Sequence, residues 1–442
     1  MRLDADPDKH LLDPNALNYS TTASRVAQGD TTFFDIRSLE LPELEKLMRD
    51  IASLPWLADE ELESAMKFLA TTPEPARSYI SALGHAVKAF NSPRPVPMYN
   101  KAISKFQRAL NHPSRGMDAI MTAKTHNCLG SCYSALGELS DSGRPIHFIL
   151  SGLGHFKNAA KMITPQADPK LWVKISGNLG ACLCSLGERV AGLEGRQHLF
   201  EAVAVCLQVL EICQQNNYHE ERLDIRENLG CALLSLGTRS TGEEAEIYLK
   251  EAKNYSQMVV DELNPELAAG KWAHAAMNLG SVLCRLGEIT NGGEGVLWLH
   301  ESTTLFKKAI LIFKREPDSM MWAQSNSCMA NALSIMGERI GGQAGRAKLM
   351  DALQYYAASL KVRKMEIAPQ QWGITQLGLG NTYLRIARME QDAQAMANSS
   401  LAMSAFDNAL AAIDDNLTQI RETAIRGRIC AVKLRMERNL ES

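Results

Sequence analysis

Small and apolar residues recur along this chain with a period of 50 residues. A leucine–glycine pair returns at that interval as Leu129-Gly130, Leu179-Gly180, Leu229-Gly230, Leu279-Gly280 and Leu379-Gly380, with Met329-Ala330 in the remaining place. A second small-residue pair follows seven residues later, from Leu136-Gly137 to Ile386-Ala387. Tryptophan keeps the same register at Trp172, Trp272, Trp322 and Trp372. Features that stay in step over several periods indicate an internal structural repeat.

The second half of each unit repeats as well. Aromatic residues stand on the same grid at Phe106, Phe156, Phe306, Tyr356 and Phe406, with a small residue four places before and an aliphatic one four places after. Spacings of three and four indicate helices, and prolines such as Pro169 and Pro369 fall between units, where they start or stop helices. We therefore predict that each unit is a helical hairpin. Helix A carries the Leu-Gly pairs, and helix B carries the small-x3-aromatic pattern.

These motifs resemble the tetratricopeptide repeat family. The family's Ala-x3-Phe-x2-Ala motif stands intact at Ala102, Phe106 and Ala109, and its Leu-Gly-x-x-Tyr motif ends at Tyr133 in one unit and Tyr383 in another. The resemblance covers roughly residues 79–416. It implies an all-α fold, a right-handed superhelical solenoid of stacked antiparallel helix hairpins with about seven repeats and a capping helix.

The repeat length departs from that family, whose units are about 34 residues long. We expect much of the excess to lie between the two helices of a unit, in residues 187–196, 237–246 and 337–346. The glycines of these segments suit helix caps and turns. No Gly-Lys-Ser/Thr follows them, so they do not predict a phosphate loop and no cofactor is expected.

The chain divides on this pattern into residues 1–75, 76–416 and 417–442. The first segment predicts two capping helices near 42–54 and 59–70, preceded by a stretch with an apolar island at Phe33-Phe34. Residues 1–40 are either a loose tail or a segment that lies in the solenoid's own groove. The last segment predicts one more amphipathic helix over 418–440, whose basic residues suit the solvated outer face at the end of an array.

Composition narrows the class of protein. The chain has 45% apolar and 22% charged residues and a net charge of −3, which argues against a general nucleic-acid binder. Its apolar runs are too short for membrane insertion, and its start lacks the apolar run of a secretion signal, so we expect a cytoplasmic protein. The ten cysteines predict reduced thiols. Cys128 and Cys132 share a helix face but lack further ligands, so no metal site is expected.

Helix A lines the concave surface in tetratricopeptide arrays, and the resemblance therefore directs attention to its polar positions. Asparagine precedes the Leu-Gly pair in three consecutive units and follows its equivalent in two later ones. An amide carries both a donor and an acceptor, and a row of amides can hold an extended peptide backbone. Alternatively, these side chains join neighbouring repeats. The predicted partner-binding residues are Lys124, Lys174, Asn178, Asn228, Asn278, Arg285, Asn331 and Asn381. The two lysines could also clamp a terminal carboxylate.

Catalytic motifs are missing from the sequence. The ten histidines are scattered, and there is no Gly-x-Ser-x-Gly, HExxH or dinucleotide fingerprint. His147 and His155 are expected to be surface or packing residues. We expect a non-enzymatic scaffold or adaptor that binds a protein or peptide segment in its concave groove. The alternative is a peptide-sensing regulator whose solenoid changes conformation when the ligand binds. If Phe33-Phe34 lies in the solenoid's own groove and blocks it, that arrangement favours the peptide-sensing regulator.

Overall fold

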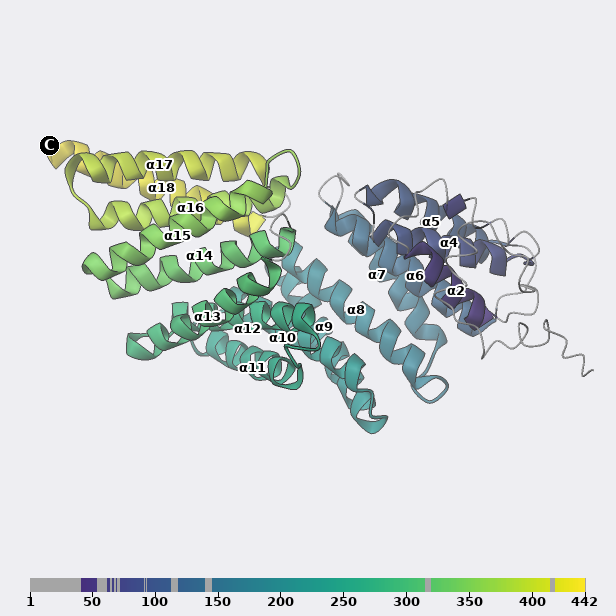
Figure 1. Ribbon diagram of the computed structural model, residues 1–442. Coiled ribbons are helices and arrows are strands. Elements are labelled where there is room, and N and C mark those ends of the chain that lie inside the picture. Colours follow the sequence, from purple (N-terminus) through teal and green to yellow (C-terminus); the bar gives the residue numbers. More distant parts are fainter. Residues whose placement is uncertain are drawn as a thin grey trace, which may run out of the picture. The chain divides into compact units, whose positions relative to one another are not determined.

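The computed structural model describes residues 41–53, 62–63, 66, 69, 72–90, 92, 94–112, 118–139, 145–314, 319–413 and 418–441. Within these residues there are sixteen α-helices and no strand (Figure 1). Contacts divide the chain into two compact units, residues 1–182 and 183–442. The all-helical architecture predicted from the repeat is confirmed.

Adjacent helices pack as hairpins, and the first member of each pair corresponds to helix A. The first unit contains α2 (Leu41–Ala52), the pair α4 (Ala76–Phe90) and α5 (Pro95–Leu110), the pair α6 (Ala119–Glu138) and α7 (Pro145–Met162), and most of α8 (Pro169–Arg189). The second unit contains α9 (Gly192–Gln215), α10 (His219–Arg239) with α11 (Gly242–Glu262), α12 (Ala269–Ile289) with α13 (Gly292–Phe313), α14 (Met320–Ile340) with α15 (Gly342–Val362), α16 (Pro369–Met389) with α17 (Asp392–Ala412), and α18 (Thr418–Glu441).

The Leu-Gly glycines mark the places where the two helices of a hairpin touch. A Cβ atom on Gly130 would lie 2.6 Å from Cε1 of Phe156, and one on Gly380 would lie 2.8 Å from Cε1 of Phe406. Both phenylalanine rings are buried. Phe156 and Phe406 of helix B therefore pack directly on the backbone of helix A, in the space that a methyl group on the glycine would need. This contact confirms the pairing of the two repeated motifs.

The segments expected between the helices are almost entirely helical, so that expectation is wrong. Helix α12 ends at Ile289 and α13 begins at Gly292, whose φ of +73° turns the chain. A Cβ on Gly295 would lie 2.2 Å from the carbonyl oxygen of Thr290. Glycine thus lets the second helix start against the end of the first, and the added length of the repeat lies in helices of 21 residues, such as α10 and α11.

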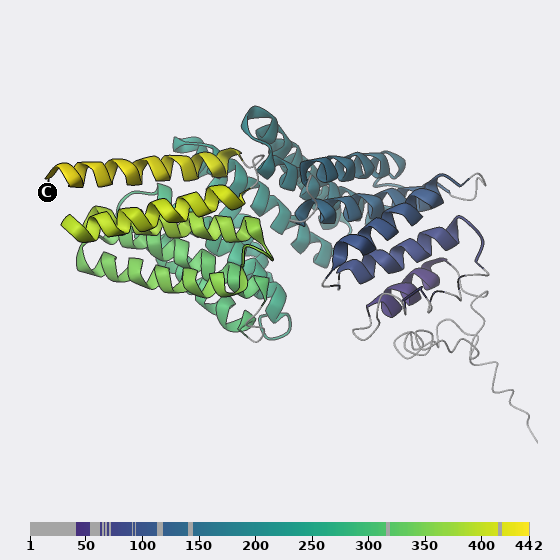
Figure 2. The same cartoon turned by 90° about the horizontal axis from the view of Figure 1, so that it is seen from above.

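The ends of the array agree with the predicted helices where the structure describes them. Helix α2 matches the helix expected near 42–54, whereas most of the one expected near 59–70 falls outside the described residues. The Phe33-Phe34 island and both interpretations of residues 1–40 also lie outside them. Helix α18 is present as predicted and packs beside α16 and α17 (Figures 1 and 2). The division at residues 75 and 416 stays a prediction.

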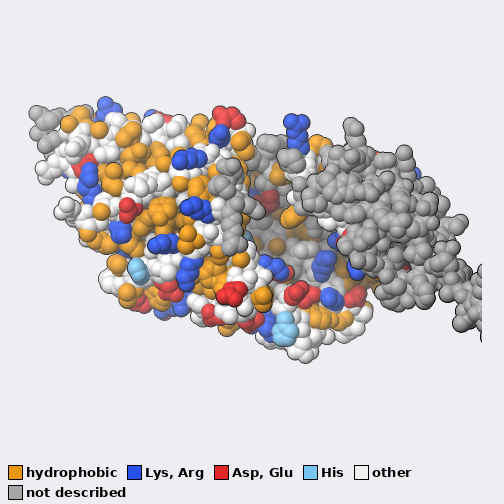
Figure 3. Space-filling view, in the orientation of Figure 1, with side chains coloured by type: hydrophobic (Ala, Val, Ile, Leu, Met, Phe, Trp, Pro, Cys, Tyr) orange, Lys and Arg blue, Asp and Glu red, His pale blue; other side chains and the backbone are white. Residues whose placement is uncertain are grey.

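The surface of the second unit mixes side-chain types. On the face seen in Figure 3, Lys and Arg side chains stand dispersed among apolar and uncharged ones. None of the helices in the described part of the chain has the length and hydrophobicity needed to cross a membrane.

Candidate functional site

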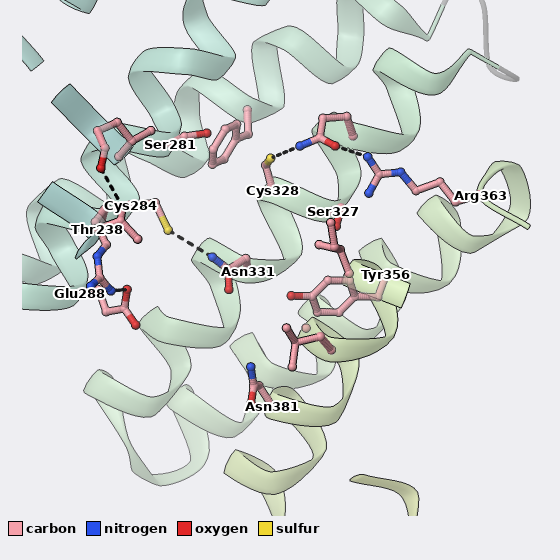
Figure 4. A pocket seen from close by; sticks show the side chains of 17 residues that line it. Thr238, Ser281, Cys284, Glu288, Ser327, Cys328, Asn331, Tyr356, Arg363 and Asn381 are labelled. Atoms are coloured by element: carbon pink, nitrogen blue, oxygen red, sulfur yellow. Dashed lines mark hydrogen bonds and ion pairs between the residues drawn. The ribbon is translucent and has the colours of Figure 1, made fainter. Parts of the chain in front are cut away.

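Four successive A helices of the second unit, α10, α12, α14 and α16, line an open cavity of about 380 Å³ (Figure 4). Hydroxyl and amide groups form much of its wall. Ser281, Asn331 and Asn381 occupy equivalent places, 50 residues apart, on three successive A helices. The Asn331 side chain donates from Nδ2 to Sγ of Cys284 at 3.7 Å. Among the described residues, the structure shows no hydrogen-bond partner for the Asn381 amide.

Helix B residues close the cavity from behind. Phe306 and Tyr356 contribute buried rings, which add apolar surface to the polar groups of the A helices. On the wall, Arg285 forms an ion pair with Glu288, one turn further along α12. A cavity of this kind offers hydrogen bonds to a backbone and an apolar surface to side chains.

A buried guanidinium also lines this cavity. Arg363 ends α15 and is only 3% exposed. Its Nη1 donates to Oγ1 of Thr375 at 3.1 Å, and its Nη2 donates to Oε1 of Gln324. Its Nε has no hydrogen-bond partner in the described part of the chain. Burial lowers the pKa of Arg363 from its ordinary value, since the charged form loses solvation.

Two thiols face the same space but are poor nucleophiles. Cys328 accepts a hydrogen bond from Nε2 of Gln324 at 3.3 Å, and Cys284 accepts the one from Asn331. Burial raises the pKa of both thiols above the ordinary value. They therefore remain protonated, and the thiolate needed for covalent chemistry is scarce.

Three of the predicted partner-binding residues, Arg285, Asn331 and Asn381, line this cavity. The cavity wall does not include Asn228 or Asn278. Asn278 donates from Nδ2 to Oε1 of Glu227 on the preceding A helix at 3.3 Å. Asn228 is half-buried on α10. The amides before and after the Leu-Gly pair therefore have different surroundings.

The remaining predicted residues lie in the first unit, and two of them bond to neighbours there. Lys124 donates from Nζ to Oε1 of Glu45 on α2 at 3.1 Å. Asn178 donates from Nδ2 to Oδ1 of Asn127 at 3.0 Å, joining α8 to α6. Lys174 is exposed on α8. The Asn178 and Asn278 contacts match the alternative in which the asparagines join repeats. Partner contact by this whole set stays a prediction.

Comparison with known proteins identifies no family. No protein-family model matches the chain, and no curated protein matches it. Among solved structures, the chain is similar to a Rap protein complexed with competence and sporulation factor, with a TM-score of 0.49, 12% identity, and coverage of 96% of this chain and 100% of that one.

Two further structures are similar at comparable coverage. The apo form of RapI has a TM-score of 0.48 and 13% identity, covering 96% of this chain and 98% of that one. A circular tandem repeat protein with novel repeat topology has a TM-score of 0.29 and 14% identity, covering 95% and 97%. The tetratricopeptide resemblance holds at the level of the fold, through the hairpins and the glycine–aromatic contacts of this chain itself.

Sequence reasoning missed Arg363, although the repeat contains a signal for it. The same place on the 50-residue grid holds an apolar residue in every neighbouring unit, namely Ile163, Cys213, Leu263, Phe313 and Ile413. Arg363 is the charged exception in that series. A charge at a position otherwise reserved for the core predicts a buried polar group with a specific role.

A histidine pair in the first unit was also missed. Nδ1 of His126 and Nδ1 of His155 lie 2.8 Å apart, and the ring of Tyr133 stacks on His155 with centroids 5.5 Å apart. Burial lowers the pKa of both histidines. His155 therefore packs between helices α6 and α7, one of the two roles expected for it. Within the described residues, no three His, Cys, Asp or Glu side chains gather as a metal site.

Proposed function

We propose that this chain is a non-enzymatic interaction scaffold or adaptor that binds an extended segment of a protein partner in the cavity of the second unit. The observation that carries the proposal is the wall formed by equivalent positions of successive A helices. Ser281, Asn331 and Asn381 repeat at the spacing of the hairpins, so they can meet successive groups of one extended ligand. Side-chain amides and hydroxyls suit a peptide backbone because they both donate and accept.

The size and lining of the cavity support this proposal. A volume of about 380 Å³ falls within the range of about 300–1,000 Å³ found for ligand pockets. The buried rings of Phe306 and Tyr356 give the cavity an apolar surface for a side chain of the ligand. The protonated state favoured for Cys284 and Cys328 argues for a binding role rather than covalent catalysis.

The proposal includes a cytoplasmic location, no cofactor, and no binding to nucleic acid or insertion into membranes. The net charge of −3 supports the expectation about nucleic acid. On the face of the second unit seen in Figure 3, Lys and Arg side chains are dispersed and do not form the stripe or patch typical of nucleic-acid binders.

The test is affinity capture from cell lysate with the full chain and a variant carrying Asn331→Ala and Asn381→Ala. Partners held by the cavity are expected to be lost in the variant. A purified segment of such a partner should then bind about tenfold or more weakly in calorimetry, since each lost amide removes hydrogen bonds. Asn408→Ala, an exposed amide on α17, is the matched control and should leave capture unchanged. Equal capture by all three proteins would place the binding surface elsewhere.

A further inference from the structure

Arg363 is a buried charge without an opposite charge. Among the described residues no carboxylate lies within ion-pair distance of its guanidinium, and its two hydrogen-bond partners, Gln324 and Thr375, are neutral. Burying a cation without an anion destabilises a fold. Each neighbouring unit avoids this by placing an apolar residue at the equivalent position. An anionic group supplied by a ligand would therefore stabilise the buried guanidinium of Arg363.

The cavity wall as a whole also favours an anion. The wall residues carry two guanidinium groups, Arg285 and Arg363, against one carboxylate, Glu288. Glu288 already pairs with Arg285, which leaves the charge of Arg363 uncompensated. A basic ligand group would meet repulsion at this point, and an acidic one would meet attraction.

We infer that the cavity recognises an aspartate or glutamate side chain of the bound peptide through Arg363. This inference rests on the proposed function. Nε of Arg363 has no hydrogen-bond partner among the described residues, while the neighbouring Nη2 donates to the amide oxygen of Gln324. Oε1 of Gln324 thus occupies the position that we assign to one carboxylate oxygen of the ligand. When the acid enters, its carboxylate accepts from Nε and Nη2 together, and these charge-assisted bonds replace a neutral one.

The burial of Arg363 favours a side chain over the carboxyl end of a chain. With 3% of its surface exposed, the guanidinium can be reached only by a group on a narrow stem. The one or two methylene groups of Asp or Glu provide such a stem. The peptide backbone then stays at the level of Asn331, which is exposed, and Asn381, which is half-buried.

A substitution that supplies the acid internally tests this assignment. Gln324→Glu places a carboxylate against Arg363 with little change in shape. We expect this variant to unfold at a higher temperature than the original protein, because the buried charge gains a partner. We also expect it to lose the preference for acidic peptides, because the site is already filled. Gln354→Glu, which adds the same charge at an exposed position on α15, is the matched control and should change neither property.

The probe is a random peptide library displayed with both peptide ends joined to flanking chain, so that no terminal carboxylate is present. The original protein should enrich sequences with Asp or Glu at one fixed position. A synthetic copy with amidated end should bind roughly tenfold more tightly than its Gln or Asn counterpart. Gln324→Glu should reduce that ratio to near one. Arg363→Met, checked for folding by circular dichroism, should do the same.

The outcomes separate the inference from the proposed function. Peptides that bind through Asn331 and Asn381 without an acid preference would overturn the inference and leave the proposed function standing. Enrichment only in a second library with free carboxyl ends would also overturn it, in favour of a terminal carboxylate. An acid preference that survives in Gln324→Glu would show that Arg363 is not the recognising group. If no peptide binds in either library, both the inference and the proposed function fail.

Discussion

Gly280 lies where α12 crosses α13, and the ring of Phe306 occupies the space that a side chain would need. A Cβ on Gly280 would lie 2.7 Å from Cε1 of that ring. Phe306 is 1% exposed, and its ring would have to shift to admit an added methyl group. Gly280 thus serves the packing of this hairpin, whereas a turn glycine such as Gly292 serves backbone conformation.

We predict that Gly280→Ala lowers the free energy of unfolding of the second unit by about 1–3 kcal/mol, because the added methyl group overpacks a filled core. The control is Gly293→Ala in the same hairpin, where an added Cβ would meet nothing within 4 Å. Alanine there should stabilise α13 by up to about 1 kcal/mol through its higher helix propensity. Urea unfolding, monitored by circular dichroism, measures the free energy of unfolding of both variants. Equal effects at the two sites would contradict the packing role of Gly280.

Arginines near the ends of the A helices join one hairpin to the next. Arg239 on α10 donates from Nη1 to the carbonyl oxygen of Val190 at 2.9 Å and from Nη2 to that of Glu188 at 2.8 Å. Arg339 on α14 donates from Nη2 to the carbonyl oxygen of Glu288 at 2.6 Å. The last carbonyls of a helix lack partners within it and carry partial negative charge. These arginines therefore cap the preceding A helix.

We predict that Arg339→Gln lowers the free energy of unfolding of the second unit by about 1–2 kcal/mol, because a charge-assisted cap on α12 is lost. Arg388→Gln is the control. Arg388 is 51% exposed and lies 3.7 Å from a half-exposed carboxylate of Glu338, so its removal should change stability by less than about 0.5 kcal/mol. Thermal and urea unfolding of both variants measure the change in the free energy of unfolding. Equal losses would show that the arginine acts as a surface charge only.

At the level of elements, the sequence predicted the helices and their pairing because those depend on local spacing. The repeated Gly280 and Phe306 positions meet as the pattern indicated. The sequence pattern did not predict the links between helices correctly. A glycine that permits close approach, such as Gly295, cannot be distinguished in sequence from a glycine that turns the chain, such as Gly292. Only contacts across the hairpin distinguish the two.

The candidate site was predictable only in part for a related reason. Asn331 and Asn381 were found because their positions repeat, and both line the cavity. Asn278 also repeats, but its amide bonds to Glu227, a partner on another helix that no local pattern reveals. Arg363 was missed because it departs from the repeat, and attention to the repeat favours what its units share. In a repeat protein, a residue that departs from the repeat, such as Arg363, can therefore mark a functional site as well as a residue that repeats.

Over the whole molecule, histidines whose pKa values are shifted in opposite directions lie in different compact units. His85 in the first unit is fully buried, and its Nε2 forms a hydrogen bond with Oε1 of Glu63 at 3.0 Å. Within the part of the chain that the structure describes, its Nδ1 has no hydrogen-bond partner. Burial lowers the pKa of His85 to about 4, and burial also lowers the pKa of His126 and His155. In the second unit, the hydrogen bond to Glu227 raises the pKa of His274.

These opposite shifts predict opposite responses to acid. A histidine whose pKa is lower in the folded state contributes stability that is present above the unfolded value of about 6.5 and is lost as the pH falls below it. A histidine whose pKa is raised contributes stability that is present at low pH and is lost as the pH rises. Acidification from about pH 7.5 to about pH 5.5 should therefore destabilise the first unit, by about 1 kcal/mol from His85 alone, while the His274 contribution to the second unit grows.

Hydrogen exchange read by mass spectrometry tests this prediction, since it reports the opening of each unit separately. After correction for the pH dependence of chemical exchange, the slowest amides of α4 and α6 should lose protection at the lower pH, while those of α12 and α14 should keep theirs. His85→Gln should remove part of the loss in the first unit, because glutamine cannot take up the proton. His300→Gln, an exposed control on α13, should not. A parallel loss in both units would mean that they open together as one cooperative block, and the separate histidine environments would then not govern the acid response.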